Sequence, residues 1–516
     1  MKCRWINTSY DDVLSRICCA LLIILVLSPP VTFAAEWDFN PRLTVSETYT
    51  DNVRLGAAGL GGGGGGFGGS GNQGGDFITQ INPGIIFTGV GRRFNIRTNY
   101  TMNNLIFAQN SNFSRIRHQL NASATTEIIK DFFFIDGMAR RLQQNASLIG
   151  PQAVDNTNVT GNRIDIRAYN ISPYLRYRFK RLASTELRYT RGIIESNLRN
   201  GLRNSQRDSF QYSLNSGSAF RTLQWGLNYS KNIIHFTRTN REIKMDRSIA
   251  NLRYNLTSQF ALTATGGYEN NDFGSASRRN LSAPSWTVGF FWAPTQRTDI
   301  NLAAGKRFFG DTYRAEANHR TRLTTWSARY IEQVTTFNQQ AGLAGGFGGG
   351  FGGGLDGLGL DGLGALGEQN NVNNGLFLQK RFSASVSLNG ARNTLSFRLF
   401  NLSRKSLSSV EDNFELSGVN NALLARDTKQ TGGNATWRYK FNQLTNAFIN
   451  IGYVKSTFLN TNRSINNMVY TANFTKELRS NLTGMLQYRR IQRQGGSGQL
   501  SNLSANSFTA SLRMDF

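Results

Sequence analysis

The C-terminal stretch Phe508-Thr-Ala-Ser-Leu-Arg-Met-Asp-Phe516 places an apolar side chain at every second position. The positions between them hold Thr, Ser, Arg and Asp. Because successive side chains of a β-strand point to opposite faces, one face of this stretch is apolar and the other is polar. The pattern predicts a strand that has lipid or a hydrophobic core on one side and water on the other.

The same alternation recurs along the chain in segments of about ten residues, a length typical of strands that cross a membrane. Ser248–Leu256 and Trp286–Trp292 are clear examples, and Tyr169–Phe179 alternates over eleven residues. Strands of soluble β-sandwiches are usually shorter, about five or six residues. The repeated pattern therefore favours an all-β transmembrane protein.

The connections between these segments alternate between short and long. The short ones are Gly89–Arg92, Lys130–Asp131, Lys180–Leu182, Thr257–Gln259 and Lys440–Leu444. The long ones are Val53–Gly75, Asn145–Asn162, Gly192–Arg207, Lys231–Met245 and Ile491–Asn506. Short periplasmic turns and long outer loops are typical of antiparallel up-and-down β-barrels in the outer membrane of Gram-negative bacteria. We expect this fold and this location.

The alternation also predicts the number of strands. Counting forward from the N-terminus and backward from Phe516 assigns opposite directions to a single strand over Tyr313–Tyr330. The side-chain parity changes within that segment as well, because Tyr313 is odd-numbered and Tyr330 is even-numbered. A tight turn near Thr321–Thr325 resolves both conflicts. It raises the expected count to about 22 strands, within a range of about 20–24.

The first 35 residues are expected to be a signal peptide, and residues 36–516 the barrel. Lys2, Arg4 and Arg16 precede an apolar run over Ile17–Leu27 and small residues near Ala35. The run is too short for a spanning helix, which needs about 20 apolar residues. All three cysteines (Cys3, Cys18 and Cys19) fall in this segment. We therefore expect no disulfide and no thiolate metal site in the exported chain.

The chain is strongly basic, with a formal net charge of +26. Removing the three basic and two acidic residues of the signal peptide leaves +25. Such a charge usually suggests nucleic acid, but export argues against that partner. The expected partners are instead outer-membrane lipid and lipopolysaccharide, with an anionic solute as the other candidate for the counter-charge.

Basic side chains recur on the polar face of the predicted strands. A charge on the lipid face at mid-membrane costs about 2–4 kcal/mol, so these side chains should face the lumen. They are Arg97, Arg176, Arg178, Arg188, Arg253, Arg398, Arg438, Arg489 and Arg513. Two interpretations stay open. A basic lumen would select anions or acidic sugars, or the arginines would pair with acidic neighbours and fill a polar interior.

Two glycine-rich inserts, residues 56–75 and 341–367, interrupt the alternation and fall in predicted outer loops. The glycine run Gly61–Gly66 is not a phosphate-binding loop, since no Gly-Lys-Ser/Thr follows it. A flexible loop is the simpler interpretation. The alternative is an adhesive or gating element, because Phe67, Phe347 and Phe351 interrupt the glycines.

Nothing in the sequence predicts catalysis, a cofactor or a metal. The three histidines are His118 at the start of a strand, His235 in a predicted outer loop and His319 near a periplasmic turn, so they cannot share a site. His235 with Asp246 is the only candidate dyad, and a single loop histidine is usually incidental. We expect a protein that is not an enzyme.

Several strings are similar to known sequences. They are Leu43-Thr-Val-Ser-Glu-Thr-Tyr-Thr-Asp-Asn-Val53, Ile171-Ser-Pro-Tyr-Leu-Arg-Tyr-Arg-Phe179, Leu187-Arg-Tyr-Thr-Arg191, His319-Arg-Thr-Arg-Leu-Thr-Thr-Trp-Ser327 and Ala391-Arg-Asn-Thr394. Their order resembles the PEP-CTERM system-associated outer membrane protein family, although the glycine inserts do not align to it. The resemblance implies an association with exosortase sorting and exopolysaccharide loci, and it supplies no catalytic residues.

Two functions are compatible with these features. The first is a porin-like barrel that passes a solute or helps to export one, for which an acidic exopolysaccharide is the candidate, together with the export components that deliver it. The second is a structural or adhesive barrel with a plugged pore. The terminal Phe516 resembles the signal that the barrel-assembly machinery reads, so that machinery is a further expected partner.

Overall fold

A computed structural model of the chain describes residues 35–56, 74–145, 148, 150–197, 204–237, 241–273, 281–336, 376–407, 427–495 and 502–516. The expected signal peptide and nearly all of both glycine-rich inserts lie outside the described residues. No helix in the described part of the chain is long and apolar enough to cross a membrane.

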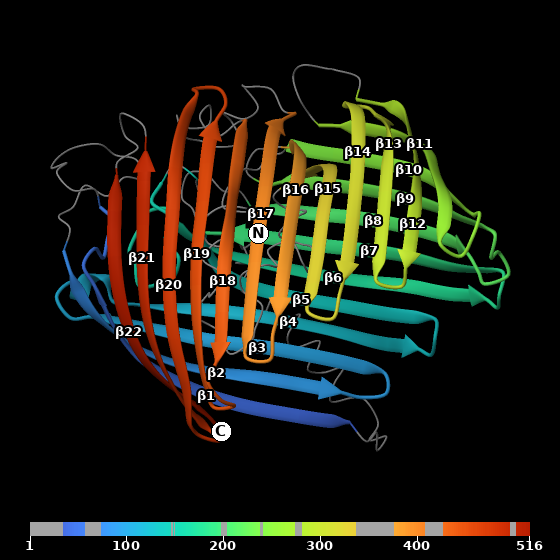
Figure 1. The fold of residues 1–516 in the computed structure, drawn as a ribbon. Helices are drawn as coiled ribbons and strands as arrows, with labels where there is room; N and C mark the ends of the chain where they lie inside the picture. Colours follow the sequence, from blue (N-terminus) through green and yellow to red (C-terminus); the bar gives the residue numbers. More distant parts are fainter. Residues whose placement is uncertain are drawn as a thin grey trace, which may run out of the picture.

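The described residues form 22 antiparallel strands and one short 3-10 helix (Figure 1). The strands are β1 (Glu36–Thr50), β2 (Asp76–Val90), β3 (Phe94–Phe107), β4 (Arg115–Ile129), β5 (Phe133–Asn145), β6 (Arg163–Phe179), β7 (Ala183–Ser196), β8 (Ser205–Ser216), β9 (Leu223–Phe236), β10 (Arg241–Asn255), β11 (Phe260–Asp272), β12 (Ala283–Thr295), β13 (Thr298–Arg307), β14 (Gly310–Arg320), β15 (Thr324–Thr336), β16 (Leu376–Asn389), β17 (Asn393–Ser406), β18 (Thr428–Lys440), β19 (Thr445–Phe458), β20 (Arg463–Arg479), β21 (Leu482–Gly495) and β22 (Leu503–Asp515). The 3-10 helix η1 covers Ser111–Phe113.

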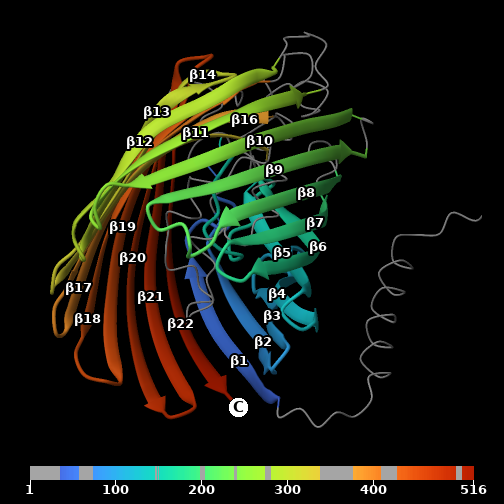
Figure 2. The ribbon, with the colours of Figure 1, turned by 90° about the vertical axis from the view of Figure 1, so that its right-hand side faces the viewer.

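Each strand pairs with the next along the chain, and β22 pairs with β1. Figure 2 shows the end of β22 beside the start of β1, where the sheet closes into a barrel. The register of this seam runs from Arg42 opposite Asp515 to Thr50 opposite Ser507. The backbone N–H of Phe516 donates to the carbonyl of Pro41 at 2.9 Å. Closure removes the free sheet edges that lipid could not solvate.

The predicted turn at Thr321–Thr325 is confirmed. Strand β14 ends at Arg320 and β15 begins at Thr324. The Thr321 hydroxyl accepts hydrogen bonds from the backbone N–H groups of Leu323 and Thr324. The predicted fold class and the count of 22 strands are confirmed as well.

The outward face of the barrel is apolar over its whole circumference. The side chains of Leu399 and Val288, for example, are 62% and 57% exposed. Soluble proteins rarely expose a continuous apolar surface of this kind. Aromatic rings gather toward both ends of the strands, as in the two aromatic belts of a membrane barrel. Toward the short turns they are Trp37, Phe39, Tyr177, Phe179, Tyr254, Trp292, Trp326 and Trp437, and toward the long loops Tyr49, Phe77, Tyr189, Phe210, Tyr268, Trp286, Tyr453, Tyr488 and Phe508.

Three expected long loops are shorter in the structure. The connection expected over Lys231–Met245 shrinks to residues 237–240, because β9 continues to Phe236 and β10 begins at Arg241. Strands β7 and β8, and β21 and β22, also extend beyond their predicted outer ends. Outside the lipid, a ladder of backbone hydrogen bonds needs no apolar face, so the alternating pattern ends before the strand does.

We predict that deleting Phe516 lowers the amount of assembled barrel, because it removes the hydrogen bond to Pro41 and the terminal aromatic residue. Heat-modifiable mobility of the outer-membrane fraction on gels measures assembly. Phe516→Tyr is the control and should assemble as the parent does. Normal assembly of the deletion variant would refute the role of this residue.

Candidate functional site in the lumen

All nine arginines predicted to face the lumen occupy strand positions that alternate with the exposed apolar ones. Arg398, for example, lies between Phe397 and Leu399, which both point outward. Eight of the nine lie in the strand halves next to the short turns, and Arg489 of β21 lies further toward the long loops. Since short turns mark the periplasmic end of such barrels, the periplasmic half of the lumen wall carries most of this charge.

Some of these arginines are paired with acids. Arg176 and Arg188 both contact Glu186, at 2.9 and 3.0 Å, and Arg188 also reaches Asp136 at 2.7 Å. The Arg188 guanidinium stacks on the Tyr174 ring at 3.7 Å. Arg513 pairs with Asp515 at 2.8 Å. This group matches the interpretation in which arginines fill a polar interior.

Five others have no carboxylate within salt-bridge distance among the described residues. They are Arg97, Arg178, Arg253, Arg398 and Arg438. Arg253 donates to Asn255 and stacks on Phe291, and Arg438 lies over Phe448. Arg97, Arg178, Arg398 and Arg438 are exposed, and in this orientation they are exposed to the lumen. The predicted role of these residues in selecting anions stays a prediction.

The connection between β5 and β6 folds into the outer half of the lumen. Described residues 148 and 150–162 of this connection, the inward loop, are mostly buried inside the barrel mouth. Asp155 pairs with Arg489 of β21, and Arg493 donates to the carbonyl of Gly150. From the other side, Arg115 of β4 donates to the carbonyls of Asn156 and Asn158, at 3.0 and 3.3 Å. The loop therefore bridges walls that lie several strands apart.

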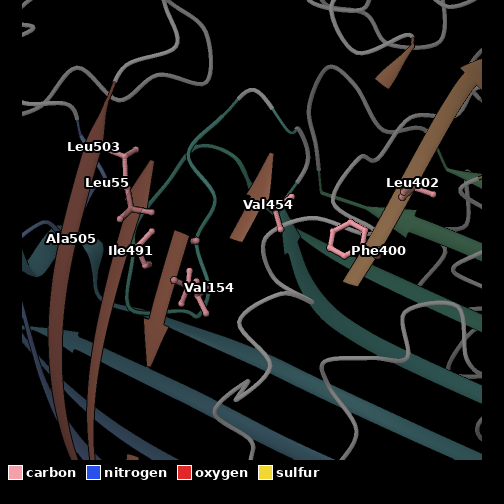
Figure 3. Packing of buried hydrophobic residues seen from close by; sticks show 10 residues of the cluster. Leu55, Val154, Phe400, Leu402, Val454, Ile491, Leu503 and Ala505 are labelled. Carbon is pink, nitrogen blue, oxygen red and sulfur yellow. The ribbon is translucent and has the colours of Figure 1, made fainter. Parts of the chain in front are cut away.

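An apolar cluster supports the inward loop. Val154 and Leu55 lie beside Ile491, Leu503 and Ala505 on the inner face of β21 and β22 (Figure 3). The same cluster includes Ala153, Phe400, Leu402, Val454 and Val469. Along the outer parts of β17 and β19–β22, several lumen-facing positions are thus apolar and buried, beside buried polar ones such as Arg489 and Arg493.

The electrostatics of the loop favour its docked position. Burial raises the pKa of Asp155, but the Arg489 guanidinium and hydrogen bonds from Thr157 lower it more, so its pKa lies below the ordinary 3.8. The Arg489 side chain is only 3% exposed. A buried charge that loses its partner is strongly destabilising, by about 3–5 kcal/mol.

Sequence reasoning assigned Arg489 to the lumen but missed its partner and the inward loop. The segment Asn145–Asn162 reads only as a long polar connection, since it shows no periodicity. One indirect sign was present. Ile491, Leu503 and Ala505 are apolar residues on the face that carries polar side chains elsewhere in the same strands.

The histidine assignments need one correction. His235 lies in strand β9, not in an outer loop, because β9 extends to Phe236. It faces Glu242 across the β9–β10 pair, whereas Asp246 faces Lys231, so the candidate dyad does not form. His118 instead contacts the Tyr100 hydroxyl at 2.8 Å and His319 contacts Thr298 at 2.8 Å. In the described part of the chain no group of three or more His, Cys, Asp or Glu side chains is placed to hold a metal ion.

We predict that Arg489→Gln releases the inward loop, since it leaves the carboxylate of Asp155 without its cation. Hydrogen–deuterium exchange over residues 150–162 should accelerate, including at Val159, whose N–H donates to the carbonyl of Val53 at 2.8 Å. Arg191→Gln is the matched control, because Arg191 pairs with Asp208 away from the loop. Unchanged exchange in Arg489→Gln would show that the ion pair does not hold the loop.

Acid should also release the loop. A carboxyl group with a lowered pKa stabilises the docked state above its ordinary pKa, and this contribution is lost as the pH falls through the lowered value. We expect loop exchange, corrected for intrinsic rates, to be constant from about pH 5 to 8 and to rise below about pH 4. Asp155→Asn should remove this acid step. A step that persists in this variant would assign it to another group.

Comparisons with known proteins show the fold and no family. No protein-family profile matches the sequence, and no curated protein matches it. The FrpB iron transporter of Neisseria meningitidis in its F5-1 variant, as apoprotein, superimposes with a TM-score of 0.51 at 9% identity, over 92% of this chain and 81% of that one. Its F3-3 variant gives 0.50 at 11% identity, over 93% and 82%. Together with the closed sheet and its apolar outer face, this likeness identifies the chain as a large outer-membrane β-barrel.

Proposed function

We propose that this barrel passes an anionic solute across the outer membrane and helps to export an acidic exopolysaccharide. The observation that carries the proposal is the division of the lumen into two halves. Its periplasmic half presents arginines that have no acidic partner among the described residues, such as Arg97, Arg398 and Arg438. Rings of basic side chains favour anions in membrane pores. A solute arriving from the periplasm would meet this basic region first.

In this proposal the inward loop is the outer constriction. Residues 150–162 narrow the mouth toward β21 and β22, and the Asp155–Arg489 ion pair holds them there. The resemblance to PEP-CTERM system-associated proteins supports the choice of a polysaccharide and of export components as partners. Lipopolysaccharide and the barrel-assembly machinery are further proposed partners. The protein would bind and guide its solute without catalysing a reaction.

A second candidate function is a structural or adhesive barrel whose pore is closed. The docked inward loop favours it, because the loop fills part of the mouth with apolar packing around Val154. The outer loops would then hold matrix or surface proteins. In this case the lumen arginines serve only to fill a polar interior.

Planar-bilayer recordings separate the two candidates. We expect open channels that prefer chloride to potassium. Replacing Arg97, Arg398 and Arg438 together by Gln should reduce this preference, because it removes unpaired positive charge from the lumen. Arg191→Gln is the control outside the lumen and should leave selectivity unchanged. Recordings that show no channel opening at any voltage, together with intact polysaccharide export in a strain that lacks this protein, would overturn the proposal in favour of the plugged barrel.

A further inference from the structure

The lumen wall is hollowed where the barrel turns a corner. Figure 1 shows β1–β10 behind, β14–β22 in front and the wall turning between them at β11–β13. A cavity of about 690 Å³ lies on the inner wall here, across β8–β14 and the turn before β9. Its size falls within the range of small-molecule sites, about 300–1,000 Å³. The hollow is separate from the inward loop, which docks on the opposite side against β17–β22.

Glycines shape this corner. A Cβ added at Gly289 would lie 2.1 Å from the carbonyl oxygen of Leu302, and one at Gly305 would lie 1.9 Å from that of Trp286. At Gly226, which lines the hollow, a Cβ would come within 2.7 Å of the Asn215 amide oxygen. At Gly289 and Gly305 the added Cβ meets backbone atoms, so the neighbouring strands approach too closely there for a larger residue, whereas at Gly226 the Asn215 side chain could move away.

Two arginines line the hollow from different strands. Arg253 of β10 is held in place by two contacts that leave its charge uncompensated: its Nε donates to the Asn255 amide oxygen at 3.0 Å, and its guanidinium lies 4.4 Å from the centre of the Phe291 ring. Arg314 of β14 has a side chain that is 55% exposed, and it forms an ion pair with Glu316 at 3.5 Å. A fixed guanidinium with free N–H groups is suited to bind a carboxylate with two parallel hydrogen bonds.

Neutral polar side chains lie between these arginines. Asn251 and Asn301 line the hollow, and the hydroxyls of Thr265 and Thr287 contact each other at 2.6 Å on adjacent strands. Amides and hydroxyls both donate and accept hydrogen bonds, so they match the hydroxyl groups of a sugar. An inorganic anion offers mainly hydrogen-bond acceptors, so it would make little use of the amide and hydroxyl oxygens that accept hydrogen bonds.

We propose that this hollow is a binding subsite for a carboxylated sugar residue of a glycan. Arg253 would hold the carboxylate, Arg314 would add positive charge, and the asparagines and threonines would contact the hydroxyls. The inference rests on the proposed function, because it names the class of solute that the lumen receives. The solute would bind on the inner wall at β8–β14 during its passage.

The test is equilibrium binding to the purified full-length barrel in detergent. Isothermal titration calorimetry would compare a defined oligogalacturonate, the matching neutral oligogalactose and inorganic phosphate. We expect the acidic oligosaccharide to bind best, and Arg253→Gln to weaken its binding roughly tenfold, because the substitution removes charge-assisted hydrogen bonds to the carboxylate. Asn251→Ala should weaken binding of the acidic oligosaccharide more than binding of phosphate, because only the sugar hydroxyls use the amide both as donor and as acceptor. Arg178→Gln, which removes a lumen arginine outside the hollow, is the matched control and should change binding little.

The outcomes are distinguishable from those of the proposed function. Equal affinity for the acidic and neutral sugars, or an equal loss in Arg178→Gln and Arg253→Gln, would overturn the subsite. Phosphate binding as tight as that of the oligosaccharide would reduce it to a simple anion site. Anion-selective channels without any sugar binding would leave the proposed function standing and remove only this inference. Specific binding in a barrel that never conducts would keep the subsite and support the plugged barrel instead.

Discussion

The need to pair every backbone N–H and C=O group within hydrocarbon governs the whole structure. An unpaired group there costs several kcal/mol, so a sheet can cross the membrane only when it has no free edge. The pairing of β22 with β1 meets this need from Arg42 opposite Asp515 to Thr50 opposite Ser507. The strand number is even because β22 pairs with β1 in antiparallel orientation. The side chains alternate because each strand has lipid on one face and the lumen on the other.

Where the strands leave the lipid, one face no longer has to be apolar, and the side chains follow a different pattern. Strands β7–β10 and β21–β22 continue as hydrogen-bonded ladders without an alternating pattern. Inside the mouth, lumen positions such as Val454 and Ile491 become apolar and pack under the inward loop. The hydrophobic effect acts twice in this barrel, outward toward lipid and, near the mouth, inward toward a loop.

Charge is divided along the same axis. In the outer half, the charge of Arg489 is neutralised by its ion pair with Asp155, which holds the inward loop. In the periplasmic half, Arg176 and Arg188 are partly neutralised by Glu186, while Arg97 and Arg398 face the lumen without a carboxylate partner. Both interpretations of the lumen arginines thus have residues that fit them. The hollow at β8–β14 adds arginines to amides and hydroxyls, a combination suited to acidic sugars.

The sequence by itself determined the barrel. A strand with lipid on one side shows a period of two in its own sequence, whatever its neighbours are. The alternation of segments such as Phe508–Phe516 was therefore sufficient for the strand count, and the parity change within Tyr313–Tyr330 was sufficient for the turn after Arg320. The inward orientation of the arginines could be predicted for the same reason.

Only the tertiary structure decided what fills the lumen. Asp155 and Arg489 are 334 residues apart, and the hollow is lined by side chains from seven strands, β8–β14. Contacts between distant strands and the curvature of a closed sheet leave no periodic trace in the chain, because they depend on how the barrel closes and not on neighbouring residues.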